Sequence, residues 1–295
     1  MVDFLVNLVN GLSLGSVYAI IALGYTMVYG IAKMLNFAHG DVIMVGAYLA
    51  YVALRQLNMP PLVSLLIAMV FCTVLGMTIE KAAYKPLRQA TSLSVLITAI
   101  GVSYFLQNMA QLIWGATPVN YPAEFISVPG VDLFDGQLHI EGATLVTILA
   151  GAAIMIGLTL FISKTKIGKA MRAVSEDRGA AELMGINVNR TISITFAIGS
   201  ALAAIAGVLL WAKVFKLEPT TGALPGIKAF TAAVLGGIGS IPGAMLGGIL
   251  LGIIEIFGRA YVSTALSDAI VFSVLIIVLL VRPTGLLGKP VREKV

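Results

Sequence analysis

Charged residues are scarce in this sequence, and it has a single cysteine. Of the 295 residues only 11% are charged, whereas 59% are hydrophobic and the mean hydropathy is +0.99. Soluble domains carry roughly a quarter of their residues as Asp, Glu, Lys and Arg, so this composition excludes a water-soluble globular domain. The lone Cys72 excludes an intrachain disulfide.

The sequence also lacks the motifs of common active sites. It contains no HExxH, CxxC or GxSxG motif, and its two histidines, His39 and His139, lie far apart. We therefore predict no catalytic residue, no metal site and no enzyme activity. The run Gly285–Lys289 is followed by proline and does not match a P-loop. If ATP drives this protein, another subunit must bind the nucleotide.

What the sequence does contain is a series of apolar blocks, each about as long as the 17 to 25 residues that cross a bilayer. We predict an all-α, polytopic bundle of about eight or nine spans that forms one domain over 1–295. The net charge of +5 does not indicate nucleic acid, because Lys and Arg gather between the blocks, where they orient a membrane protein. The expected spans are 5–30, 39–57, 61–80, 92–114, 143–162, 191–211, 226–257 and 267–281.

Charge assigns the longer connections to opposite sides of the membrane. The segment 163–190 has six basic and three acidic residues and should be cytoplasmic, whereas 115–142 has no Lys or Arg and should be extracytoplasmic. Within the latter, the runs 125–128 and 138–140 flank Asp135-Gly136 and predict a short hairpin or lid. A solvated linker is the alternative. No internal repeat is evident.

Two stretches interrupt the apolar pattern and indicate broken or re-entrant helices near 30–40 and 236–243. The block 226–257 is too long for one straight helix, so we expect half-helices joined at Pro242 or a re-entrant segment. Such backbone must be buried or line a wet cavity. We take these breaks and two upstream tyrosines as candidates for a translocation path: Tyr25, Tyr29, Asn36, His39, Asp41, Gly236, Gly237 and Gly239. Capping or packing is the alternative role for the polar cluster around His39.

Ionisable residues deep in the membrane are expected to be few. Most, such as Glu80 and Asp268, fall at the ends of apolar blocks, where they can reach the headgroups. Glu255 is expected to pair with Arg259 rather than contact a substrate. The scarcity of buried carboxylates argues against an ion-coupled secondary transporter, which is the alternative from another functional class.

The segment 163–190 mixes charged residues with small apolar ones. It predicts one or two short amphipathic helices at the cytoplasmic surface, with Gly185 as the stop. A linker and a lipid-bound helix are alternatives, but its alanines and acidic residues favour docking to a soluble protein.

Four stretches, in order, resemble the signatures of the LivH-type permeases of branched-chain amino acid ABC importers. They are Gly11–Ala19, Asn36–Asp41 with Gly46-Ala47-Tyr48, Gly168–Ile186, and Gly236–Ser240 with Gly243. The resemblance covers essentially the whole chain. It implies that the cytoplasmic segment contacts an ATPase through Lys169, Arg172, Ala173, Glu176, Asp177, Ala180, Ala181 and Gly185.

The resemblance further implies import of leucine, isoleucine or valine across the cytoplasmic membrane of a prokaryote. It implies as partners a second, LivM-like permease, two ABC ATPases that bind ATP and Mg, and an extracytoplasmic substrate-binding protein. This chain is expected to bind no cofactor and to meet lipid but no nucleic acid. Related permeases carry urea or short amides, which stay open as substrates.

Overall fold

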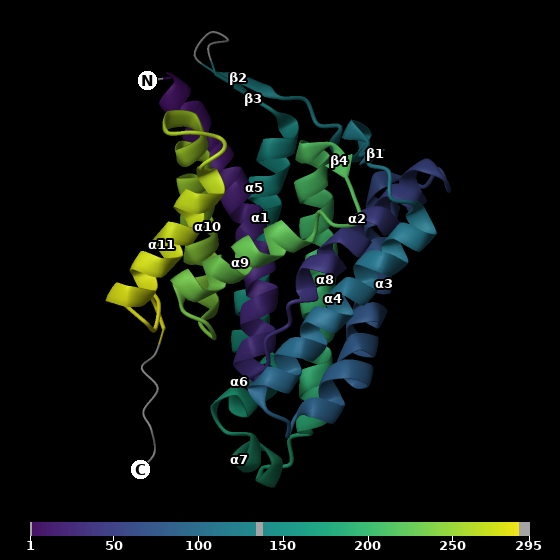
Figure 1. Cartoon of the computed structure of the whole chain (residues 1–295), viewed down its shortest axis with the longest axis vertical. Coiled ribbons are helices and arrows are strands. Elements are labelled where there is room, and N and C mark those ends of the chain that lie inside the picture. The colour runs from purple at the N-terminus through teal and green to yellow at the C-terminus, as the bar shows by residue number, and fades with distance from the viewer. Residues whose placement is uncertain (1, 134–137, 289–295) are drawn as a thin grey trace.

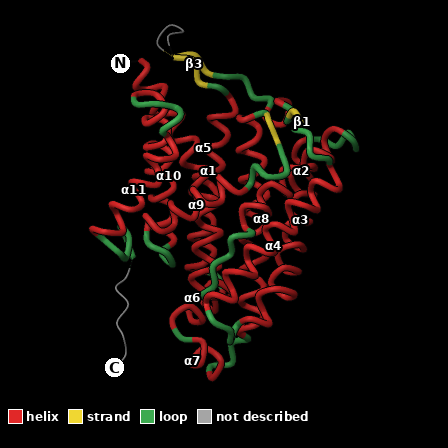
Figure 2. The backbone as a smooth tube through the Cα atoms, in the orientation of Figure 1, coloured by secondary structure: helices red, strands yellow, loops and turns green. Residues whose placement is uncertain are grey.

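The structure is a computed structural model and describes residues 2–133 and 138–288. It is a bundle of helices with short strands at one end (Figure 1). Loops connect the helices and make up little of the described chain (Figure 2). The α-helices are α1 Val2–Ala32, α2 His39–Arg55, α3 Pro61–Ile79, α4 Ser92–Trp114, α5 Gly142–Lys164, α6 Lys166–Glu176, α7 Arg178–Leu183, α8 Val188–Val214, α9 Ala223–Gly236, α10 Ile241–Tyr261 and α11 Ser267–Val281. A π-helix over Glu80–Tyr84 and a 3-10 turn over Lys85–Leu87 continue α3.

Among the described residues, six helical segments are long and apolar enough to cross a membrane. They are α1, α3 with its continuation to Leu87, α4, α5, α8 and α10. This confirms a polytopic helical bundle, but the predicted count of eight or nine spans is not confirmed. The helices α2, α9 and α11 have 17, 14 and 15 residues. At 1.5 Å per residue they reach about 21 to 26 Å, less than the roughly 30 Å of hydrocarbon.

The first predicted break is present. α1 ends at Ala32, and Lys33 adopts a left-handed conformation with φ of 53°. The loop 33–38 then runs back along the bundle before α2 begins at His39 (Figure 2). α2 therefore starts inside the bundle and not at its end.

The block 226–257 consists of two helices, α9 and α10, but they are not joined at Pro242. The break lies at Gly237–Ser240, and Pro242 belongs to the first turn of α10, where proline loses no helical hydrogen bond. Gly237 and Gly239 have φ values of 107° and 91°, which residues with a Cβ rarely adopt.

The chain contains an inverted repeat. α8 also ends in a left-handed residue, Phe215 with φ of 60°, and the following segment returns into the bundle before α9 begins. The pairs α1–α2 and α8–α9 thus have the same arrangement, a long helix followed by a returning segment and a short helix. The two pairs run in opposite directions (Figure 1). α1 packs along α9 and α10 in the way that α8 packs along α2 and α3. Inverted repeats with discontinuous helices are a common architecture of membrane transport proteins.

The two short helices meet at their N-termini. Gly40 at the start of α2 lies against Gly222 and Gly226, and a Cβ added to Gly40 would lie 2.5 Å from the carbonyl oxygen of Gly222. Only glycine permits this approach. The contact fixes the beginning of α2 against the beginning of α9 in the middle of the bundle.

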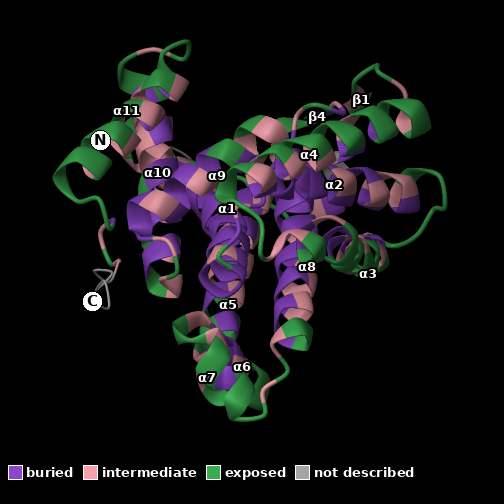
Figure 3. Cartoon of the chain, turned by 60° about the horizontal axis from the view of Figure 1, so that its bottom comes forward, coloured by how far each residue is buried: buried purple, intermediate pink, exposed green. Residues whose placement is uncertain are grey.

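Burial separates an inner group of helices from an outer one (Figure 3). Most of α8 and much of α1 are buried, whereas α3, α4 and α5 are largely exposed. Their exposed side chains include Leu62, Val70, Phe105, Leu149 and Leu160. Such faces suit contact with lipid or with another membrane subunit.

The predicted hairpin within 115–142 is correct only in its second half. β2 Val131–Leu133 pairs antiparallel with β3 Leu138–Ile140, with Val131 opposite Ile140, and the expected Asp135-Gly136 turn lies outside the described residues. The run 125–128 is not a strand: Ala123–Ile126 is a 3-10 turn, and Pro129 blocks a ladder there. β1 Val119–Asn120 pairs antiparallel with β4 Lys216–Leu217, which ties the segment to the end of α8. We call the end with these strands the outer end and the end with α6 and α7 the inner end.

Candidate functional site

Two large cavities lie along α1 near its opposite ends. The outer cavity, of about 440 Å³, is lined by α1, α8 and α10 near the outer end. The inner cavity, of about 410 Å³, is lined by the last turn of α1, the loop 33–35, residues 88–95 and Arg178. α9 packs across α1 between them (Figure 1).

Aromatic side chains close the space between the two cavities. The ring of Phe230 on α9 lies 5.9 Å from that of Tyr25 and 5.5 Å from that of Phe37, centroid to centroid. We call these three residues the aromatic closure. Beside it remains a void of about 10 Å³, lined by Tyr25, Tyr29, Asn36 and Phe230 among others. That volume admits about one water molecule.

Three predicted path residues therefore come together at this closure. Tyr25, Tyr29 and Asn36 line the void, and the Asn36 Oδ1 atom accepts a hydrogen bond of 2.9 Å from Tyr84. No side chain caps α2, whose N-cap is Ala38. The capping alternative is thus wrong for the polar cluster.

His39 and Asp41 lie behind the closure, each 1% exposed. The His39 ring packs edge-on against Tyr25 at 4.7 Å, and the Asp41 Oδ1 atom accepts a 2.9 Å hydrogen bond from Gln107 of α4. Among the described residues, His39 Nε2 and Asp41 Oδ2 have no hydrogen-bond partner. Unpaired polar atoms at such depth are costly, which favours a functional reason for them.

The predicted glycines Gly236, Gly237 and Gly239 do not line the void, although their neighbour Ile238 does. The segment after α11 covers Gly236 and Gly237: the N–H groups of Leu286 and Leu287 donate to the carbonyls of Leu235 and Gly236, whereas Gly239 faces Gly30 of α1 and lines a smaller cavity beside it. Their evident role is the turn between α9 and α10.

An ion cluster centred on the buried Lys228 and Glu255 holds α9 in place, and of its contacts only the Glu255–Arg259 pair was predicted from the sequence. Lys228 is 5% exposed and donates to Glu255 at 2.8 Å and to Asp268 at 2.6 Å. Glu255 also accepts from Tyr18 at 2.8 Å and pairs with Arg259, as predicted. The cluster joins α9 to α1, α10 and α11 with balanced charge. Because partners compensate their charges, the buried Lys228 and Glu255 need not reach the headgroups, whereas the side chains of Arg259 and Asp268 are 42% and 47% exposed.

Glu80 was expected to reach the lipid headgroups, but its side chain is buried inside the bundle. It is 1% exposed, pairs with Arg88 and accepts a 2.7 Å hydrogen bond from Ser193 of α8. These contacts fasten the end of α3 to the start of α8. Among the described residues, no group of three or more His, Cys, Asp or Glu could hold a metal ion.

The segment 163–190 forms two short helices, α6 and α7, as predicted. Thr165 and Asp177 cap them through the N–H groups of Gly168 and Ala180, both at 3.0 Å, and Gly185 with φ of 80° follows α7. Of the predicted contact residues, Ala181 is buried and Ala173 is half-buried. The others are exposed: Lys169, Arg172, Glu176, Asp177, Ala180 and Gly185.

The exposed end of α7 is apolar. Leu183 is 91% exposed and Met184 is 81% exposed, and they stand at the C-terminal end of α7, the helix at the tip of the inner end (Figure 1). Two large apolar side chains projecting from a charged segment are typical of a protein contact.

Arg178, the first residue of α7, connects this segment to the first break. Its guanidinium donates to the carbonyl oxygens of Ile31, at 3.4 Å, and Ala32, which end α1. The last turn of α1 has no basic residue, so Arg178 supplies the cation that a helix C-terminus favours. Burial, and then the nearby Arg88, lower the pKa of Arg178. In the sequence, Arg178 stands out only as one of the six basic residues of the segment 163–190.

The sequence matches, over residues 7–279, the family described as the permease component of the branched-chain amino acid transport system. It is 49% identical to the high-affinity branched-chain amino acid transport system permease protein BraD of Pseudomonas aeruginosa, over 99% of this chain and 98% of BraD. The LivH permease protein of Escherichia coli K12 is 47% identical over the same shares. A probable LivH of Methanocaldococcus jannaschii is 31% identical over 91% of this chain and 88% of the relative.

Among solved structures, PsaBC from Streptococcus pneumoniae in complex with Fab has a similar fold. The TM-score is 0.51, and the match covers 93% of this chain and 91% of that chain. At 15% sequence identity this likeness concerns the fold alone.

Proposed function

This chain belongs to the permease family of branched-chain amino acid transport systems, and from that premise we propose that it imports leucine, isoleucine or valine across the cytoplasmic membrane of a prokaryote. It is a transporter subunit and not an enzyme. The proposal of these substrates is based on the full-length sequence similarity to BraD and LivH. Counting the short helices α2, α9 and α11 as partial spans raises the six long segments to nine membrane segments.

The substrate path runs along α1, from the outer cavity, past the aromatic closure, to the inner cavity. A zwitterion with an apolar side chain needs polar groups for its two ends and an apolar wall for its body. Tyr25, Tyr29 and Asn36 supply the polar groups at the closure, and His39 and Asp41 lie behind them. Two cavities separated by a space for about one water support an alternating path that is closed at its middle.

The driving force comes from partner subunits. Two ATPases bind ATP and Mg, and the segment 169–185 docks on them, with Leu183 and Met184 as apolar contacts. A second, LivM-like permease pairs with this chain, and an extracytoplasmic binding protein delivers substrate to the outer end. The exposed coupling residues and the apolar tip of α7 support this arrangement.

The test is uptake by proteoliposomes that contain the co-purified complex, its binding protein and internal ATP. Labelled leucine is expected to accumulate only with ATP and binding protein. Urea or acetamide uptake in place of leucine would assign the chain to the alternative substrates. Uptake by this chain alone under a proton or sodium gradient would establish a secondary transporter instead.

A further inference from the structure

The outer cavity contains a lysine that two hydroxyl groups hold in place and that forms no ion pair within the described part of the chain. Lys213, in the last turn of α8, donates to Ser13 Oγ at 2.9 Å and to Thr144 Oγ1 at 2.8 Å. Ser13 and Thr144 are buried on α1 and α5. In the described part of the chain, no carboxylate forms an ion pair with Lys213, although Glu141, the residue before α5, lies near enough to attract its charge. An ammonium group has three donors, so one N–H and the charge are left for a ligand.

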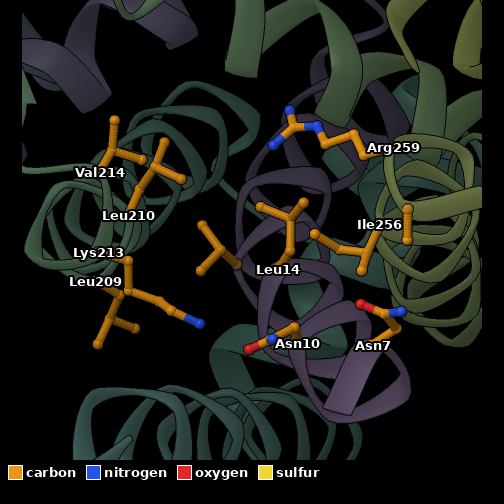
Figure 4. Close-up of a pocket in the computed structure, with 11 residues that line it drawn as sticks. Asn7, Asn10, Leu14, Leu209, Leu210, Lys213, Val214, Ile256 and Arg259 are labelled. Carbon is orange, nitrogen blue, oxygen red and sulfur yellow. The ribbon is translucent and has the colours of Figure 1, made fainter. Parts of the chain in front are cut away.

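Lys213 points into the cavity toward Asn10, beside Leu14 of α1 (Figure 4). Leu210 and Ile256 form the walls on either side. The second cation of the cavity, Arg259, is already paired with the fully buried Glu255. Lys213 therefore gives the cavity its positive charge.

The remaining polar groups of the cavity are the amides of Asn7 and Asn10. Their side-chain oxygens accept no hydrogen bond from the described residues and can receive N–H donors from a ligand. The cavity thus offers a fixed cation, amide acceptors and an apolar wall of leucine and isoleucine. A ligand that satisfies all three has a carboxylate, an ammonium and an apolar body.

We propose that the outer cavity is a binding site for an apolar α-amino acid, with Lys213 as the residue that binds its carboxylate. The ammonium faces Asn7 and Asn10, and the branched side chain lies against Leu14, Leu210 and Ile256. The proposal rests on the proposed function for delivery of substrate to this end, and it goes further by assigning the residues that hold the substrate before the closure opens.

The experiment measures binding without ATP, by saturation-transfer NMR on the complex of this chain with its partner permease and ATPases in nanodiscs, without the binding protein, which would itself bind leucine. Three probes separate the groups: leucine, 4-methylpentanoate, which lacks the ammonium, and leucinamide, which lacks the carboxylate. Lys213→Gln is expected to weaken leucine and 4-methylpentanoate about 10- to 100-fold, the effect of losing a charged hydrogen bond, and to leave leucinamide unchanged. Lys216→Gln is the matched control, because Lys216 is exposed and pairs with Glu218 outside the cavity; it should bind all probes as wild type does.

A second variant guards against a folding defect of Lys213→Gln. Leu210→Trp keeps the contacts of Lys213 and fills the cavity, so it should also lose leucine binding. Wild-type leucine binding in either variant overturns the proposal. So does displacement of leucine in nanodiscs of phosphatidylglycerol but not of phosphatidylcholine, which would assign the cavity to a lipid phosphate.

The outcomes also separate this site from the proposed function. If the wild-type complex carries no leucine but its preference for leucine over leucinamide depends on Lys213, the carboxylate site stands and the transport proposal fails. If leucine is transported and Lys213→Gln binds it normally, only the site assignment fails.

Discussion

Replacing Arg178 with alanine is expected to separate ATP hydrolysis from transport. The guanidinium of Arg178 holds the last carbonyls of α1 and joins the segment 169–185, which we propose as the coupling segment, to the break before α2. A hydrogen bond from a charged donor contributes about 1.5 to 3 kcal/mol, and a cation at a helix C-terminus adds up to about 2 kcal/mol. Arg178 is half-buried, so we take a total of about 2 kcal/mol. As a coupling free energy this corresponds to about 30-fold.

The assay compares leucine uptake with ATP hydrolysis in the same proteoliposomes. For Arg178→Ala the ratio of uptake to hydrolysis should fall about 30-fold, because the ATPases turn over without moving the end of α1. For Arg178→Lys the ratio should fall less, since lysine keeps the positive charge but lacks the planar guanidinium that donates several hydrogen bonds. Arg190→Ala, an exposed arginine at the start of α8, should keep the wild-type ratio. An unchanged ratio in Arg178→Ala, or a parallel loss of both activities, would refute the reasoning.

Three further changes test other parts of the molecule. Lys228→Met leaves Glu255 buried with one cation fewer and should cost about 3 to 5 kcal/mol, read as a lower thermal midpoint in detergent; an equal midpoint would contradict the cluster's role. Phe230→Ala should open the aromatic closure and permit leucine efflux from vesicles without ATP. Phe230→Tyr keeps an aromatic ring at this position and should show no such efflux. Ala180→Trp should disturb docking of the exposed face of α7 and lower uptake per ATP, and normal coupling would remove Ala180 from the interface.

The helical bundle and its breaks could be predicted because both are local properties of the sequence. Polar residues from Asn36 to Asp41 interrupt the apolar run where α2 begins, and glycines interrupt it before α10. Proline misled the prediction at Pro242, because a proline suits the first turn of a helix as well as a break. The number of spans could not be predicted, since hydropathy does not report that α2 and α9 start halfway through the bundle.

The contacts that build the site are long-range and leave no local pattern. Arg178 meets a carbonyl 147 residues away, and Tyr18 meets Glu255 across 237 residues. The inverted repeat is equally hidden in the sequence. Its two halves have the same left-handed break after the long helix, at Lys33 and at Phe215, but they have no evident sequence similarity. Periodicity predicted the coupling segment, whose helices are short, capped and local, but not what that segment contacts.

A continuous series of contacts joins the coupling segment to the aromatic closure. Arg178 holds the end of α1, the loop 33–38 leads to α2, Gly40 packs on Gly222 at the start of α9, and α9 carries Phe230. Proximity alone does not make this a route of coupling, and a double-mutant cycle provides the test. If movement at Arg178 acts by opening the closure, Arg178→Ala should have a much smaller effect on uptake per ATP in the Phe230→Ala background, where the closure is already open. If the effects of the two substitutions on uptake per ATP are additive, Arg178 acts at another step of the transport cycle.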